Sequence, residues 1–89
     1  MPQAHILYTG RVQGVGFRYT VQRIAVQAGL CGWVRNLSNG GVEILVEGDN
    51  EDIERLMQEV DAYFDGYIRD KEVARQPSTE KFKDFQIVF

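Results

Sequence analysis

The sequence predicts an α+β domain in which two helices pack on one face of an antiparallel sheet of four to five strands. Three observations support this fold class. Strand-like apolar runs alternate with two segments of helical period in the order βαββαβ, an Asn-Gly turn signal joins the second and third runs, and 89 residues suffice for a single core. No repeat or linker interrupts the chain, so we expect one domain over residues 1–89.

The composition is that of a folded, mildly acidic protein. Apolar residues make up 44% of the chain and charged residues 26%, with a net charge of −3. Such a chain is a poor electrostatic match for nucleic acid or an anionic membrane, so any anion site must be local. No apolar run reaches membrane-spanning length, and no signal-peptide pattern is present. We expect a cytoplasmic monomer, and the lone Cys31 is consistent with a reducing compartment.

The first two predicted elements are a strand and an amphipathic helix. The strand covers residues 5–12, an apolar run that ends in a glycine-rich segment. The helix carries apolar side chains at i, i+4, i+7, i+8 and i+11, namely Phe17, Val21, Ile24, Ala25 and Ala28. We expect Gly29 to end this helix, since glycine is favoured just after the last helical turn.

A β-hairpin is predicted next. Its first strand covers residues 30–37 and is followed by the Asn39-Gly40 pair, which favours the positive φ of a tight turn. The second strand alternates two sets of residues, Val42, Ile44 and Val46 with Glu43, Leu45 and Glu47. This alternation predicts a buried apolar face, with Glu43 and Glu47 on a solvated face.

A second helix and two further strands complete the prediction. The helix repeats apolar residues at i, i+3, i+4, i+7 and i+11, namely Ile53, Leu56, Met57, Val60 and Phe64. Asp49 or Asn50 can cap its start. Residues 67–75 predict an edge strand and residues 76–81 a loop. A final strand is predicted from the alternation of three apolar residues, Phe85, Ile87 and Phe89.

Residues 10–18, with the sequence GRVQGVGFR, join the first strand to the first helix. Glycine has no Cβ and can adopt positive φ, so the three glycines allow successive backbone N–H groups to point into one concavity. The helix that follows directs its unpaired N–H groups to the same place, and Arg18 adds a planar guanidinium suited to phosphate. The pattern predicts an anion-binding loop. The alternative is a tight strand-to-helix turn that binds no ligand.

Residues 10–18 resemble the phosphate-binding loop of the acylphosphatase family. Residues 32–36, with the sequence GWVRN, together with the Gly-Val-Glu at residues 41–43, resemble the other signature of that family. The resemblance covers almost the whole chain, most closely over residues 6–48. It implies a ferredoxin-like fold and hydrolysis of acyl phosphates to a carboxylate and inorganic phosphate, with no metal ion and no cofactor.

The resemblance also implies roles for particular residues. The phosphate-binding residues would be Gln13, Gly14, Val15, Gly16, Phe17 and Arg18. The catalytic residues would be Arg18, which offsets the phosphate charge, and Asn36, which orients the attacking water. On local grounds alone, Asn36 is better explained as a polar residue that starts a turn with Ser38 and Asn39. Only the family resemblance places it beside the loop.

Other chemistries find little support in the sequence. A metal site lacks ligands, because the chain has one histidine, His5, one cysteine, Cys31, and acidic residues that are scattered rather than clustered. His5 is expected at a strand end on the surface. Cys31 has no basic or histidine neighbour in the sequence that would activate its thiol, so we do not expect a covalent thiol mechanism.

Two alternatives from other functional classes share the predicted fold. Some RNA-binding modules have the same βαββαβ order, but the low isoelectric point near 5.0 and the sequence VEILV at residues 42–46, which has no aromatic or basic residue, argue against one. An anion-binding domain without catalytic activity is the second alternative. The sequence leaves it open, since a loop and an arginine can bind phosphate without turnover.

Overall fold

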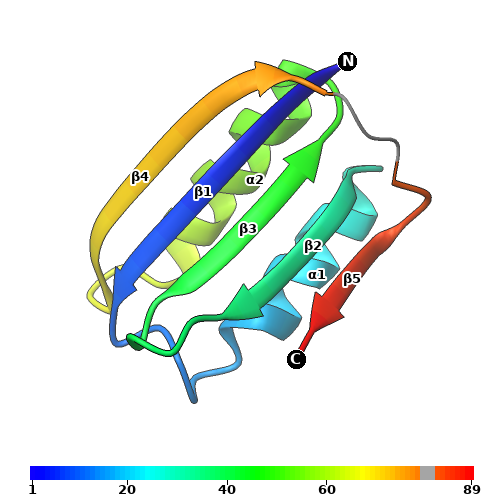
Figure 1. The fold of residues 1–89 in the computed structure, drawn as a ribbon. Coiled ribbons are helices and arrows are strands. Elements are labelled where there is room, and N and C mark those ends of the chain that lie inside the picture. Colours follow the sequence, from blue (N-terminus) through cyan, green and yellow to red (C-terminus); the bar gives the residue numbers. More distant parts are fainter. Residues whose placement is uncertain (79–81) are drawn as a thin grey trace.

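The computed structural model describes residues 1–78 and 82–89 and confirms the predicted fold class. Its elements are β1 (Pro2–Gly10), α1 (Phe17–Gln27), β2 (Cys31–Asn36), β3 (Val42–Glu47), α2 (Asn50–Tyr63), β4 (Ile68–Pro77) and β5 (Phe85–Val88). The strands form one sheet in the order β4-β1-β3-β2-β5, and both helices cover the same face of it (Figure 1). Within the described ranges, neither helix is long and apolar enough to cross a membrane.

The sheet is mixed, which corrects the expectation of a wholly antiparallel one. The pairs β1–β3, β1–β4 and β2–β3 are antiparallel, but β5 lies parallel to β2. The reason lies in where β4 ends. Pro77 is opposite Pro2, so β4 finishes beside the start of β1, and a strand returning from there runs in the direction of β1 and β2 (Figure 1).

Several strand boundaries also differ from the prediction. β1 spans Pro2–Gly10 instead of residues 5–12, because it pairs with β4 as far as its first residue, while Val12 leaves the sheet to be fully buried. β4 is the predicted edge strand but continues to Pro77, two residues into the predicted loop. The end of that loop, residues 79–81, lies outside the described residues. β5 ends at Val88, so Phe89 follows the strand.

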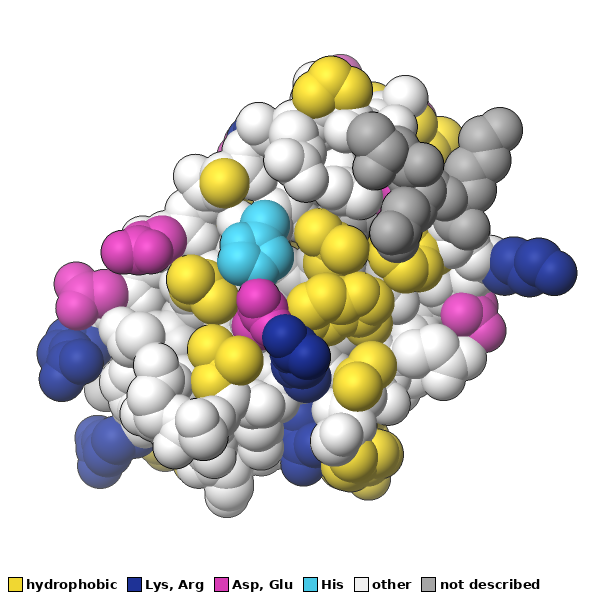
Figure 2. Space-filling view, viewed as in Figure 1, with side chains coloured by type: hydrophobic (Ala, Val, Ile, Leu, Met, Phe, Trp, Pro, Cys, Tyr) yellow, Lys and Arg dark blue, Asp and Glu magenta, His cyan; other side chains and the backbone are white. Residues whose placement is uncertain are grey.

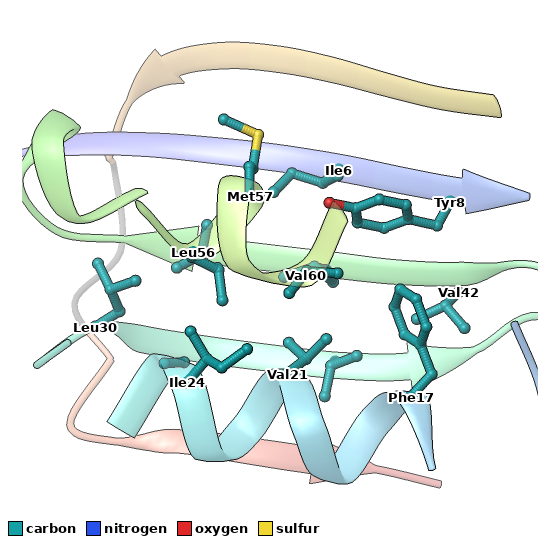
Figure 3. Packing of buried hydrophobic residues seen from close by; sticks show 14 of the residues in the cluster. Ile6, Tyr8, Phe17, Val21, Ile24, Leu30, Val42, Leu56, Met57 and Val60 are labelled. Carbon is teal, nitrogen blue, oxygen red and sulfur yellow. The ribbon is translucent and has the colours of Figure 1, made fainter. Parts of the chain in front are cut away.

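The core fills the space between the helices and the sheet (Figure 3). α1 and α2 bury the faces predicted for them, namely Phe17, Val21, Ile24 and Ala25 from α1 and Ile53, Leu56, Met57 and Val60 from α2. Phe17 matters most for the site, because its ring lies 5.2 Å from that of Tyr8 and 4.4 Å from that of Phe64, measured between centroids. Burying one such side chain contributes about 1.5–3 kcal/mol. The first turn of α1 is thereby fixed to one end of the sheet.

Tyr8 joins this contact to a second anchor. Its hydroxyl donates a hydrogen bond to Asp61 on α2 over 2.9 Å, and Lys71 on β4 donates to the other oxygen of Asp61 over 2.6 Å. Burial raises the pKa of Tyr8 and the Asp61 carboxylate raises it further, so the hydroxyl stays protonated. Asp61 thus links β1, β4 and α2, and Tyr8 connects this group to Phe17 at the start of α1.

The opposite face of the sheet carries no helix of the described residues, and Figure 2 shows His5, the one histidine of the chain, on this face with an acidic and a basic side chain beside it. Glu43 accepts hydrogen bonds from His5 Nε2 and from Arg35 Nε, each over 2.6 Å. Partial burial raises the pKa of Glu43, but these two hydrogen bonds outweigh it and hold the pKa below its usual value. The side chain is only 14% exposed, so its prediction as part of a solvated face was wrong.

Glu47, predicted on the same solvated face, is buried at 4% exposure. Its carboxylate accepts hydrogen bonds from the Ser78 hydroxyl and from the Phe82 N–H, the latter over 2.8 Å. Burial raises the pKa of Glu47, but the hydrogen bonds together lower it below its usual value. The carboxylate thereby attaches both described ends of the β4–β5 connection to β3.

Candidate active site

The loop between β1 and α1 has the backbone shape that the sequence predicts. Gly14 and Gly16 both have φ of 77°, in the left-handed region that favours glycine, and Gly16 is the N-cap of α1. The N–H groups of residues 14–16 donate to no protein acceptor in the part of the chain that the structure describes. Because the first turn of a helix also leaves its N–H groups unpaired, this segment offers a group of donors to an anion.

Gln13 holds the loop in place. Its Nε2 donates to the backbone oxygens of Leu37 and Gly41, each over 2.8 Å, and so ties the loop to the β2–β3 hairpin. Val15 is 38% exposed and contributes only its backbone to the loop. Of the six predicted phosphate-binding residues, four line the hollow over this loop, and Gln13 and Val15 are not among its lining residues.

A hollow of about 200 Å³ lies over the loop. Its lining comes from the loop, from the first turn of α1 and from the end of β2, and comprises Val12, Gly14, Gly16, Phe17, Arg18, Tyr19 and Asn36. The fold thus brings Arg18 and Asn36 to one cavity. Asn36 reaches it because it is the last residue of β2, at the end of the sheet where the loop lies (Figure 1).

Arg18 is held beside this hollow by an aromatic ring. Its guanidinium carbon lies 4.8 Å from the centroid of the Phe89 ring, at a distance typical of a cation–π contact. It forms no ion pair with a carboxylate among the described residues. No local pattern in the sequence indicates this contact, because the parallel pairing of β5 with β2 is what carries Phe89 to this end of the sheet.

Asn36 leaves a hydrogen-bonding group unused. Its Oδ1 is buried and accepts no hydrogen bond from the described residues. A buried, unpaired polar atom costs about 1–3 kcal/mol, so native proteins rarely keep one without a water or ligand beside it. No signal in the sequence could have shown this, because the burial of Asn36 depends on the packing of the loop against β2.

The donors in the hollow suit an anion better than a cation. They include backbone N–H groups, the Arg18 guanidinium, the Asn36 amide and the Tyr19 hydroxyl, and no carboxylate lines the hollow among the described residues. Across the described ranges, no group of three or more histidine, cysteine, aspartate or glutamate residues is close enough to hold a metal ion.

The fold and the hollow define a ferredoxin-like α+β protein with a candidate anion site at one end of its sheet. The sequence profile of the family described as Acylphosphatase matches residues 4–87. An acylphosphatase of Bacillus pumilus is 41% identical over 85 residues, which cover 93% of each chain. The crystal structure of acylphosphatase from Bacillus subtilis superimposes over all of both chains with a TM-score of 0.93 at 41% identity. A Coxiella burnetii acylphosphatase structure matches with a TM-score of 0.83 at 30% identity, over 97% of this chain and 90% of its own.

The chain therefore belongs to the acylphosphatase family, and the enzymatic activity that this family name denotes is the hydrolysis of acyl phosphates.

Proposed function

We propose that the chain hydrolyses the carboxyl–phosphate bond of acyl phosphates without a metal ion, with residues 13–18 holding the phosphoryl group and Asn36 orienting the water. The observation that carries this proposal is that Asn36, whose buried Oδ1 has no hydrogen-bond partner among the described residues, lines the same hollow as Arg18. A buried acceptor of this kind is normally satisfied by a hydrogen-bond donor, and a water molecule bound beside Asn36 would supply one.

Binding of the phosphoryl group falls to the loop and to Arg18. Phosphoryl transfer needs little covalent help from the protein, because the reaction depends on positioning and on offsetting the charge of the equatorial oxygens. The N–H groups of residues 14–16 donate to no acceptor among the described residues, so an anion can bind to them without breaking a protein hydrogen bond. The Arg18 guanidinium supplies the full positive charge.

Asn36 acts on the water. Its Oδ1 accepts a hydrogen bond from the water and leaves a lone pair of the water oxygen directed at phosphorus. As the new O–P bond forms, the bond between phosphorus and the carboxyl oxygen breaks, and its electron pair leaves with the carboxylate. The amide is too weak a base to take a proton, so the water proton passes to a phosphate oxygen. The carboxylate is a good leaving group and needs no general acid.

A hydrolysis assay tests the activity and its independence of metal. Loss of acetyl or benzoyl phosphate is followed with purified protein in excess chelator. We expect turnover that the chelator does not change. A rate equal to spontaneous hydrolysis would instead leave a phosphate-binding domain without catalysis.

Two substitutions separate the proposed roles. Asn36→Ala should lower kcat by about two to three orders of magnitude, the usual effect of losing one preorganised group at a developing charge, and should largely keep the affinity for inorganic phosphate. Arg18→Gln should weaken phosphate binding and abolish turnover, because it removes the only full positive charge among the described residues that line the hollow. The matched controls, Asn50→Ala on α2 and Arg23→Gln on the exposed side of α1, should retain activity. Activity near the wild-type level in Asn36→Ala would contradict the role given to this residue.

We also propose that residues 1–89 act as one monomeric domain, as the sequence predicts, and sedimentation of the active protein tests this. Its location in the cytoplasm stays a prediction from the sequence.

A further inference from the structure

A second and larger hollow, of about 630 Å³, lies at the same end of the sheet as the candidate active site. Three segments meet there, namely the end of β1, the turn of the β2–β3 hairpin and the turn from α2 to β4 (Figure 1). Among the described residues that line it are two arginines, Arg11 and Arg69, and no acidic residue. This is unexpected in a chain with 13 acidic and 10 basic side chains, and it makes the hollow locally positive.

Arg11 is preorganised in this hollow. Its guanidinium carbon lies 5.4 Å from the centroid of the Tyr67 ring, and its backbone N–H donates to the Tyr67 oxygen over 2.8 Å. The side chain and the backbone of Arg11 are thus fixed to the same turn. A guanidinium held on an aromatic face loses less freedom when it binds an anion, and its planar set of donors matches phosphate and carboxylate.

Arg69 contributes the second charge from the start of β4. Its Nε lies 3.4 Å from a carboxylate oxygen of Asp70, but both side chains are more than 70% exposed. An exposed pair of this kind is weak in water, so an incoming anion can compete with Asp70 for the guanidinium. Gly40 and Gly66, also in the lining, have no atom within 4 Å of the position of a Cβ, so the space beside these two glycines is open.

The two hollows are connected through the loop that follows β1. Gln13 donates to the oxygen of Gly41, which lines the larger hollow, while the next residue, Gly14, lines the smaller one. Arg11 and Gly14 are three residues apart, so their Cα atoms are separated by at most about 11 Å. The two hollows therefore lie close to each other at this end of the sheet.

We propose that the larger hollow is a second anion-binding site, which takes the phosphate or carboxylate group of a small molecule between Arg11 and Arg69. That group comes either from a separate small anion or from the far end of an acyl phosphate whose phosphoryl group lies on the loop. The site itself does not depend on turnover. Only the second source rests on the proposed function.

Binding is tested by ¹⁵N NMR titration of the full chain with inorganic phosphate and, separately, with succinate. We expect the amides of Gly40 and Gly66 to shift with one dissociation constant and those of Gly14 and Gly16 with another. Arg69→Gln should raise the dissociation constant obtained from the Gly40 and Gly66 amides about tenfold, because a charge-assisted hydrogen bond is lost. The Gly14 and Gly16 response should keep its dissociation constant.

Arg55→Gln is the matched control, since it removes the same charge from an exposed position on α2 that lines a different hollow. It should change neither response. The proposal is overturned if Gly40 and Gly66 do not shift, if all four amides follow a single dissociation constant that Arg18→Gln abolishes, or if Arg55→Gln has the effect expected of Arg69→Gln.

Kinetics then identify the source of the anion. The measured quantity is the ratio of KM for succinyl phosphate, which carries a terminal carboxylate, to KM for butyryl phosphate, which does not. A rise of this ratio of about tenfold in Arg69→Gln supports binding of the far end of the substrate. A constant ratio with a retained succinate response in the NMR titration supports a separate anion. If the protein hydrolyses neither compound, the proposed function fails, and the NMR titration still decides whether the second site exists.

Discussion

Phe89 places its aromatic ring against the guanidinium of Arg18, 4.8 Å from the ring centroid to the central guanidinium carbon. The ring is itself 91% exposed, so it contributes little to the core. Its position next to a half-buried arginine instead restricts the conformations that this arginine can adopt. An arginine already held near its binding geometry loses less entropy when the anion arrives.

Removing this ring should therefore weaken phosphate binding. We expect Phe89→Ala to raise the dissociation constant for inorganic phosphate about two- to fivefold, which corresponds to the 0.5–1 kcal/mol of an exposed cation–π contact. Isothermal titration calorimetry measures the change. Phe89→Trp keeps an aromatic ring and should retain the wild-type affinity. Val88→Ala is the control, because it truncates the side chain next to Phe89. Equal affinities in Phe89→Ala and wild type would show that the ring does not position Arg18.

At the scale of the elements, the connection between β4 and β5 depends on one carboxylate. Glu47 lies on β3, but its hydrogen-bonding partners Ser78 and Phe82 belong to the connection that follows β4. The connection crosses from one edge of the sheet to the other and allows β5 to pair with β2. Glu47 therefore stabilises an element to which it does not belong.

Glu47→Gln tests this role. The substitution keeps the size of the side chain but replaces one acceptor oxygen with a donor, so a hydrogen bond to a buried, charged acceptor is lost. We expect the free energy of unfolding to fall by about 1–3 kcal/mol in urea denaturation at pH 7. Glu72→Gln changes an exposed glutamate on β4 and should alter stability by less than about 0.5 kcal/mol. Equal stability of the two variants would contradict the structural role of Glu47.

The elements with local signals could be predicted from the sequence, and those without could not. The 3.6-residue spacing of Phe17, Val21 and Ile24 identifies α1, and the Asn39-Gly40 pair identifies the hairpin, because each signal lies within the element that it predicts. The parallel pairing of β5 and the burial of Glu47 depend on contacts between segments that are distant in the sequence. No local pattern encodes such contacts.

The same distinction applies to the candidate site. The glycines of the loop predict its backbone shape, and the family resemblance suggests Asn36, but the unpaired Oδ1 of Asn36 is visible only in the folded chain. The larger hollow is even harder to predict from the sequence, since Arg11 and Tyr67 are 56 positions apart and neither is unusual in its own segment. A hollow lined by three segments that are distant in the sequence leaves no motif there.

At the scale of the whole molecule, two glutamates link stability to pH. The pKa values of Glu43 and Glu47 are both lowered by folding from a usual value of 4.5. The unfolded chain therefore binds protons more readily than the folded one as the pH falls. Their stabilising contribution is present at neutral pH, begins to be lost as the pH falls below about 5, and is gone below the folded pKa values.

We therefore expect the free energy of unfolding, measured by urea denaturation between pH 7 and pH 3, to decrease towards the acid end. The gap between wild type and Glu47→Gln should narrow over the same range, because protonation makes the wild-type side chain neutral like the variant. A gap of the same size at pH 3 and pH 7 would show that the charge of Glu47 does not contribute to stability.

The pairing of β1 also has a consequence for how the molecule reaches its structure. Neither sheet neighbour of β1 is its successor in the chain, since Gln3 is opposite Glu47 and Pro2 is opposite Pro77. Closing such long loops is entropically costly and places a protein among the slower two-state folders, on the scale of milliseconds to seconds. The loop that follows β1 acquires its shape only when these distant pairings form. In a refolding experiment, the ability to bind phosphate should therefore return in the last phase, together with the native sheet.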